Sequence, residues 1–227
     1  ADIIAWFRKV QHYDNQWISR QQALKDTGGK VPPALDKDEA NIVQSRMVSL
    51  LQSQKQAKTL NLPQPTAQDP RPFEVVGIPL SPGFHVVEIA SQKLGSSLLD
   101  ERHGPQRTLY VRTSAMVTNL GVHFKLGREN ALAWVTTLDK GQAVAGAKVA
   151  VSDCSGKPLA QGVTNAQGMV TLLGISPQAP VCGRGHDEGD YRQAYFVSAR
   201  ATQAQAGGKG TVEDLAFTWS DWNRGIE

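Results

Sequence analysis

The amino-acid sequence predicts a mostly β fold, made of two tandem antiparallel β-sandwiches with one α-helix inserted in the first. Turn signals recur every ~8–12 residues, as is typical of sandwiches. Several segments alternate apolar and polar side chains with a period of two, the pattern of a half-buried strand. A length of 227 residues allows two units of about a hundred residues each. We place the boundary near Ser114, which gives domains at 1–113 and 114–227.

Composition and charge exclude several classes of protein. Hydrophobic residues make up 40% of the chain and charged residues 20%, which is ordinary for a globular domain. The net charge is only +3, and the Lys and Arg residues are scattered, so no nucleic-acid partner is predicted. No apolar run reaches the ~20 residues of a membrane span. Ala1 opens without a signal segment, and we expect the sequence to be a piece of a longer chain.

The first domain is predicted from two aromatic-rich strands, one helix and a hairpin. Residues 2–10 and 13–19 read as strands because of their Trp and Phe anchors. Apolar residues at spacings of three, four and seven predict a helix over about 38–57, and we expect it to pack on its own sheet and not on a partner. The remaining expected elements are a proline-rich connection at 61–72, strands at 73–80 and 84–90, a loop at 91–105 and a strand at 107–113.

The second domain is predicted from a continuous series of strands and turns. Residues 120–126 have the cleanest period-two alternation in the chain. Residues 131–174 follow as a meander, in which Gly, Asn, Asp and Pro mark each turn. Two closing strands are expected at 193–201 and 211–218.

The polar segment from Cys182 to Asp190 is the most tempting place for a metal. It holds a thiol, an imidazole and carboxylates in nine residues. Zinc sites usually need four ligands from paired knuckles, and calcium loops need a twelve-residue frame that this segment does not follow. A solvated Gly-rich loop is favoured, with no metal and no cofactor. The rival hypothesis is an enzyme accessory domain in which His186, Asp187 and Asp190 bind metal.

Other catalytic patterns are missing from the sequence, and no catalytic residue is predicted. A nucleophile elbow of the form G-x-S-x-G does not occur. Residues 207–210 lack the glycine spacing of a phosphate loop and read as a hairpin loop. The five histidines are far apart, and lone histidines are more often surface residues than ligands. They are His12, His85, His103, His123 and His186, while Trp219 and Trp222 are expected to cover a join to a further domain.

Two cysteines leave the disulfide question open. Cys154 and Cys182 lie 28 residues apart in the second domain. Two cysteines in a sandwich form either an inter-strand disulfide or two buried thiols.

The order of motifs resembles the macroglobulin domains of the bacterial alpha-2-macroglobulin family. Residues 112–227 carry the specific series, the closing segment FTWSDWNRGIE looks like the lead into that family's next domain, and residues 1–111 match less distinctively. The matching segments are Arg107–Ser114, Leu120-Gly121-Val122, Ala133-Trp134-Val135-Thr136, residues 141–149 and Thr164-Asn165-Ala166-Gln167-Gly168.

This resemblance implies Ig-like, macroglobulin-type sandwiches in a broad-spectrum endopeptidase inhibitor of host defence. The full-length protein would be a periplasmic lipoprotein of the inner membrane. Its implied partners are neighbouring domains of the same chain, target proteases and a periplasmic penicillin-binding protein. An oxidising periplasm further implies a Cys154–Cys182 disulfide.

The sequence also departs from the part of that family that carries chemistry. A thioester needs Cys-x-x-Gln, and the third positions after Cys154 and Cys182 hold Lys157 and Gly185. The chain is therefore expected to be non-catalytic scaffold, with bait and thioester elements elsewhere. The alternative function is a tandem Ig-like adhesion or carbohydrate-binding module, because its turn patterns also occur in many surface β modules.

Overall fold

A computed structural model describes residues 2–29, 41–62, 75–99, 107–182, 192–204 and 210–220, and it confirms the mostly β fold class. The chain divides into two compact units. Unit 1 comprises Ala1–Arg8, Pro82–His85 and Ala115–Glu227. Unit 2 comprises Lys9–Ser81 and Val86–Ser114. In the described residues no helix is both long and apolar enough to cross a bilayer.

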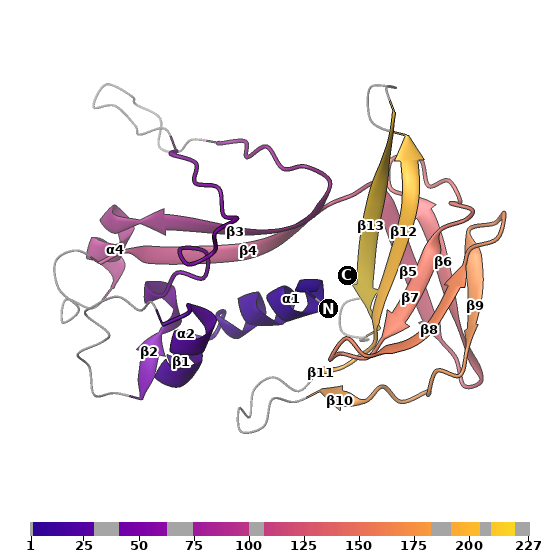
Figure 1. The fold of residues 1–227 in the computed structure, drawn as a ribbon, viewed down its shortest axis with the longest axis horizontal. Helices are drawn as coiled ribbons and strands as arrows, with labels where there is room; N and C mark the ends of the chain where they lie inside the picture. Colours follow the sequence, from indigo (N-terminus) through magenta and orange to yellow (C-terminus); the bar gives the residue numbers. More distant parts are fainter. Residues whose placement is uncertain are drawn as a thin grey trace. The chain divides into compact units, whose positions relative to one another are not determined.

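Unit 1 is a sandwich of two antiparallel sheets, drawn as two facing layers in Figure 1. One sheet has the strand order β13-β12-β7-β8 and the other β5-β6-β9. The strands are β5 (Leu120–Leu126), β6 (Asn130–Thr137), β7 (Lys148–Ser152), β8 (Pro158–Val163), β9 (Met169–Leu173), β12 (Phe196–Ala204) and β13 (Thr211–Trp219), with a short pair of β10 (Val181–Cys182) and β11 (Arg192–Gln193) beside them.

The core of unit 1 lies between these sheets and follows the period-two alternation of the strands. Small β-branched and alanine side chains from both sheets are almost fully buried. Gly162 lets β8 approach β9, because a Cβ there would lie 2.6 Å from Val170 Cγ2. The core residues include Leu120, Ala131, Ala133, Val135, Val149, Val151, Leu172, Val197, Ala199 and Ala216.

Two buried polar side chains hold connections of unit 1 in place. Asp214 is 4% exposed and accepts hydrogen bonds from Thr118 Oγ1 at 2.7 Å and from the Asn119 N–H at 2.8 Å. These bonds fix the turn that leads into β5. Tyr195 is 1% exposed, and its hydroxyl lies 2.9 Å from the Ser176 carbonyl oxygen. The phenol therefore anchors the connection that follows β9.

The strands predicted in the second half of the sequence are confirmed. The strand expected at 120–126 coincides with β5. The meander expected over 131–174 contains β6, β7, β8 and β9 in that order. The closing strands expected at 193–201 and 211–218 are β12 and β13, with the first beginning three residues later than expected.

Unit 2 combines short helices with two antiparallel strand pairs. Strand β1 pairs with β2, and Ile18 lies opposite Val43. Strand β3 pairs with β4 in a separate two-stranded sheet. The first residues of β3 and the last residues of β4 belong to unit 1. The elements are α1 (Asp2–His12, of which 2–8 belong to unit 1), β1 (Trp17–Ser19), α2 (Arg20–Asp26), β2 (Ile42–Gln44), the 3₁₀ turn η1 (Ser45–Met47), β3 (Gly83–Ser91), α4 (Gln92–Leu98) and β4 (Leu109–Val117).

The strand predicted at 2–10 is wrong, because this segment forms the helix α1. Ile4 and Val10 are 4% and 5% exposed, and Phe7 between them is half-buried. Their spacing of three residues places them on one helix face. Of the strand predicted at 13–19, only Trp17–Ser19 is extended.

The helix predicted over about 38–57 is also wrong in its described part, 41–57. Ile42–Gln44 is the strand β2, η1 follows, and residues 48–57 contain no helix. Val48 and Leu50 are both 0% exposed. The apolar residues of this segment are therefore buried by tertiary contacts of a loop, and the helical spacing is not used.

Two smaller predictions fail in the same unit. The segment predicted as a loop at 91–105 contains α4, which begins where the Ser91 hydroxyl accepts a hydrogen bond from the Leu94 N–H at 3.1 Å. The strand predicted at 73–80 is wrong in its described part, because residues 75–80 form no strand. The strands predicted at 84–90 and 107–113 are confirmed as parts of β3 and β4.

Candidate functional site: the buried Glu88–Arg112 cluster

Glu88 on β3 and Arg112 on β4 form a charged pair with buried side chains in unit 2. Their side chains are 5% and 3% exposed, and Arg112 Nε lies 3.4 Å from Glu88 Oε2. The two strands are neighbours in one sheet, which brings the opposite charges together. A buried charge is tolerated only when it is paired and hydrogen-bonded, so this pair must organise its surroundings.

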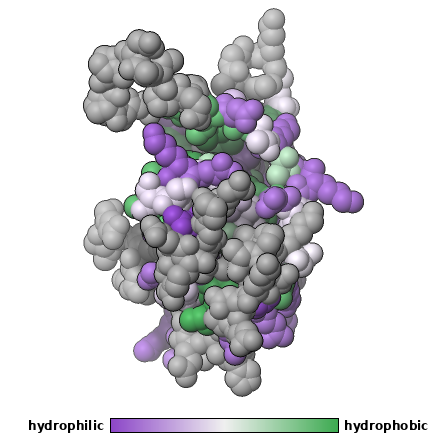
Figure 2. Space-filling view, turned by 90° about the vertical axis from the view of Figure 1, so that its left-hand side faces the viewer, coloured by the Kyte–Doolittle hydropathy of each residue, from purple (hydrophilic) through white to green (hydrophobic). Residues whose placement is uncertain are grey.

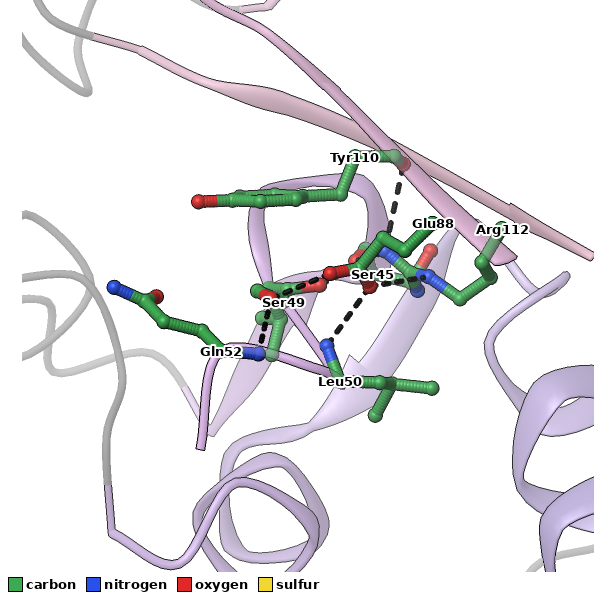
Figure 3. Close-up of polar contacts among 8 residues, drawn as sticks. Ser45, Ser49, Leu50, Gln52, Glu88, Tyr110 and Arg112 are labelled. Atoms are coloured by element: carbon green, nitrogen blue, oxygen red, sulfur yellow. Dashed lines mark hydrogen bonds and ion pairs between the residues drawn. The ribbon is translucent and has the colours of Figure 1, made fainter. Parts of the chain in front are cut away.

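Glu88 binds the segment that follows η1. One carboxylate oxygen accepts a short hydrogen bond from the Ser49 hydroxyl, and the other accepts from the Leu50 N–H at 2.9 Å. The Ser49 hydroxyl accepts in turn from the Gln52 N–H at 3.0 Å. Figure 3 shows the Ser49 and Leu50 contacts meeting at the Glu88 carboxylate and the Gln52 contact ending at Ser49. Both oxygens of Glu88 are therefore used within the chain.

Arg112 binds the same segment from its other side. Its Nη2 donates to the carbonyl oxygens of Val48 at 2.8 Å and Ser45 at 3.1 Å. The guanidinium carbon lies 5.0 Å from the centre of the Tyr13 ring, a cation–π arrangement. Burial lowers the pKa of Arg112, and the Glu88 carboxylate opposes that shift.

Tyr13 extends the cluster toward α1 and α2. It is 3% exposed, and its pKa is raised well above the ordinary value, first by burial and then by the negative charge of Asp26. Asp26 is itself held by Gln22 Nε2 at 2.7 Å and by Lys9 Nζ at 3.4 Å. The phenol is therefore kept neutral beneath the guanidinium.

This arrangement suits holding a loop and does not suit catalysis. The carboxylate and the guanidinium are both directed at backbone groups and side chains of residues 45–50. A catalytic base needs an oxygen that can reach a substrate proton. The cluster instead replaces the helical hydrogen bonds that residues 45–50 do not make.

The two cysteines lie close to one connection of unit 1. Cys154 is 0% exposed, and its Sγ lies 3.4 Å from the carbonyl oxygen of Pro180, two residues before Cys182. Cys182 ends β10. The Cys154–Cys182 disulfide remains a prediction.

Most of the other residues considered from the sequence are not brought together. His186, Asp187 and Asp190 lie outside the described residues, as do His103, Trp222 and residues 207–209. His123 stacks on Trp134, with ring centres 5.3 Å apart, and His12 ends α1 while His85 lies on β3. Within the described ranges, no group of three His, Cys, Asp or Glu residues is placed to hold a metal ion.

Sequence reasoning did not identify the Glu88–Arg112 cluster. Glu88 interrupts an apolar strand, and Arg112 occupies an alternating strand twenty-four positions later. The available signal was an isolated acidic residue in one predicted strand and a basic residue in the next. That signal does not single out the pair, because each residue alone is compatible with a solvent-facing position.

Large hydrophobic side chains are exposed at separate places in unit 2. On the face drawn in Figure 2, the coloured residues show small hydrophobic areas between hydrophilic ones and no continuous hydrophobic surface. Singly exposed apolar residues are normal in soluble proteins and need no partner. The exposed side chains include Trp17, Ile42, Leu94, Leu98 and Val111.

Comparison with known proteins assigns the sandwich. Residues 117–227 match the family model of the bacterial alpha-2-macroglobulin MG3 domain. No curated protein sequence matches the chain significantly.

Two solved structures of native alpha-2-macroglobulin from Escherichia coli resemble the chain, both with a TM-score of 0.30. The one spanning domains NIE-MG1 is 20% identical and covers 46% of this chain and 39% of its own. The one spanning MG0-NIE-MG1 is 19% identical, with coverages of 46% and 27%. The chain thus spans well under half of either, and TM-scores this low add nothing to the assignment. Residues 117–227, just under half of the chain, are therefore similar to the MG3 domain of the bacterial alpha-2-macroglobulin family.

Proposed function

We propose that the chain is a non-catalytic scaffold segment of a bacterial alpha-2-macroglobulin-type protease inhibitor. The observation that carries this proposal is the MG3 match over a two-sheet sandwich whose interior is filled by its own side chains. A domain packed in this way transmits position and strain without offering a substrate-sized interior. The bait and thioester elements of the inhibitor would lie in other parts of the full-length protein.

Rigidity is the property that such a segment contributes. Val135, Val149 and Val197 from the two sheets are at most 1% exposed. Asp214 and Tyr195 fix the turns at which the strands enter and leave the core. A sandwich fixed at its core and at its turns holds the domains on either side at constant separation, which a protease trap requires.

The proposal extends to location and partners. We propose a periplasmic full-length protein, anchored to the inner membrane as a lipoprotein. Its partners would be neighbouring domains of the same chain, target proteases and a periplasmic penicillin-binding protein. An oxidising compartment would favour the Cys154–Cys182 disulfide. The position of Cys154 Sγ, 3.4 Å from Pro180 in the connection that leads to Cys182, supports that pairing.

The scaffold role is tested by measuring protease inhibition and the folded fraction of the same full-length variants. Val197→Ala removes methyl groups from a fully buried position, and Lys148→Ala is the matched control on the exposed surface of the neighbouring strand β7. Inhibition of a protease acting on a large protein substrate is measured beside the folded fraction. Inhibition should fall with the folded fraction for Val197→Ala and remain at the wild-type level for Lys148→Ala.

Two results would contradict the proposal. One is loss of inhibition in a fully folded Lys148→Ala protein, because a scaffold does not depend on a single exposed side chain. The other is stoichiometric binding of the 227-residue chain to glycans, which would favour the adhesion or carbohydrate-binding alternative.

A further inference from the structure

The outward face of the four-stranded sheet in unit 1 carries an aromatic cluster. Val197 on β12 and Ala216 on β13 point into the core. Side chains alternate along a strand, so the residues at odd spacings from these two point outward. They are Phe196, Phe217 and Trp219. The ring centre of Phe196 lies 4.9 Å from that of Phe217 and 5.1 Å from that of Trp219. Yet Phe196 is only 7% exposed. Another part of the chain must therefore shield this face from solvent.

One part of the cover is Phe84 on β3, whose ring centre lies 6.0 Å from that of Phe217. The other part comes from the beginning of the chain, and both belong to the same compact unit as the sheet. The ring centre of Phe7 on α1 lies 6.0 Å from that of Phe217 and 5.8 Å from that of Trp219. One turn earlier, Ile4 is 4% exposed. Arg8 Nη1 donates to the carbonyl oxygen of Cys154 at 3.4 Å. Residues more than a hundred positions away in the sequence therefore complete the MG3 sandwich.

This cover is incomplete at the first turn of the helix. Phe7 meets Phe217 edge-on and Trp219 at a tilt, at ring-centre distances that are ordinary for aromatic pairs. A pocket of about 350 Å³, partly open to solvent, lies between the first turn of the helix and the sheet. Its lining includes Asp2, Ile3, Ile4, Ser198, Arg200 and Leu215. Contacts that stop short of close packing forfeit much of their dispersion energy, so the cover is held less firmly than a core element.

We propose that residues 2–8 form a detachable helical strap, whose docking surface is the face made by Phe196, Phe217 and Trp219. Residues 2–8 are the first part of α1, and an eleven-residue helix is only marginally stable alone in water. The strap therefore depends on the face for its helical state, and the face depends on the strap to exclude water. This inference does not depend on the inhibitor role.

The test is amide hydrogen exchange of the whole chain at Trp6, Phe7 and Arg8, in the wild type and in Phe217→Ala. Removing the ring on β13 should release the strap and accelerate exchange at these three amides by about tenfold. The matched control is Trp134→Ala, because Trp134 is a 43% exposed ring on the other sheet. The control should leave exchange at the three amides unchanged. Equal exchange in Phe217→Ala and the wild type would overturn the proposal.

A second variant keeps the test valid if Phe217→Ala disturbs the sandwich, which faster exchange in β5 and β6 would reveal. Phe7→Ala alters only the strap. Hydroxyl-radical labelling of Phe217 and Trp219 should rise several-fold in that variant, with labelling of Trp134 unchanged. Unchanged labelling of all three rings would show that residues 2–8 do not cover the face, and the strap would be rejected.

Discussion

Arg112 Nε lies 3.4 Å from Glu88 Oε2 in unit 2, with both side chains at most 5% exposed. The pair joins β3 and β4 to residues 45–50 through hydrogen bonds to Ser45, Val48, Ser49 and Leu50. It is thus a clamp between a strand pair and a loop. The stability of unit 2 should depend on it strongly.

Glu88→Gln should destabilise unit 2 by about 3 kcal/mol, because it leaves the buried Arg112 guanidinium without a counter-charge. Urea denaturation followed by circular dichroism measures the change. The control is Glu213→Gln, which breaks the Arg200–Glu213 pair at side-chain exposures of 54% and 68%. Solvent screening limits the expected cost there to about 0.5 kcal/mol. Equal costs for the two variants would show that the buried pair is not a clamp.

The second half of the chain could be predicted from its sequence because local signals and tertiary contacts agree there. In β5 to β9 the alternation of side chains, the turn glycines and the buried core indicate the same strands. Gly168 illustrates this, since its φ of 73° is needed in the turn before β9.

The first half could not be predicted to the same degree because its signals are ambiguous. A short apolar run such as residues 2–10 is compatible with a strand or a helix, and the spacing of Ile4, Phe7 and Val10 was the signal that favoured the helix. At residues 45–50 the side chains of Glu88 and Arg112 satisfy backbone groups that a helix would have paired internally. No local pattern reveals partners that lie about forty to seventy residues away.

Tyr13 should make unit 2 less stable at high pH. Its pKa is raised in the folded chain, so above the ordinary value of 10.0 the unfolded state releases a proton that the folded state keeps. The contribution is fully present below pH 10 and is lost as pH rises above it. Tyr13→Phe keeps the ring beneath Arg112 but removes the ionisable hydroxyl. Between pH 10 and 11 the free energy of unfolding should therefore fall by about 1 kcal/mol less in this variant than in the wild type. Parallel pH profiles for the two proteins would contradict this assignment.

Asp214→Ala should destabilise unit 1 by about 2 kcal/mol, because the partly buried Asn119 N–H and Thr118 hydroxyl lose their acceptor. Glu213→Ala, at the adjacent exposed position, is the control and should be nearly neutral. Denaturant midpoints of the two variants measure the difference. An unchanged stability of unit 1 in Asp214→Ala would show that the Asp214 carboxylate does not hold the turn before β5.

The predicted disulfide should appear as two blocked thiols. Intact mass of the denatured chain should be unchanged by alkylation before reduction and should increase by two adducts after it. Reduction should also lower stability by about 3 kcal/mol in the chain-entropy description. Alkylation of both Cys154 and Cys182 without prior reduction would exclude the pairing.

The scaffold account is tested most directly by comparing the 227-residue chain with the full-length protein in one protease assay. Cleavage of a large protein substrate and of a small peptide substrate is followed at equal molar amounts of each. The account predicts that the full-length protein protects the large substrate, and that the 227-residue chain neither inhibits the protease nor hydrolyses either substrate. Stoichiometric inhibition by the 227-residue chain alone would contradict it.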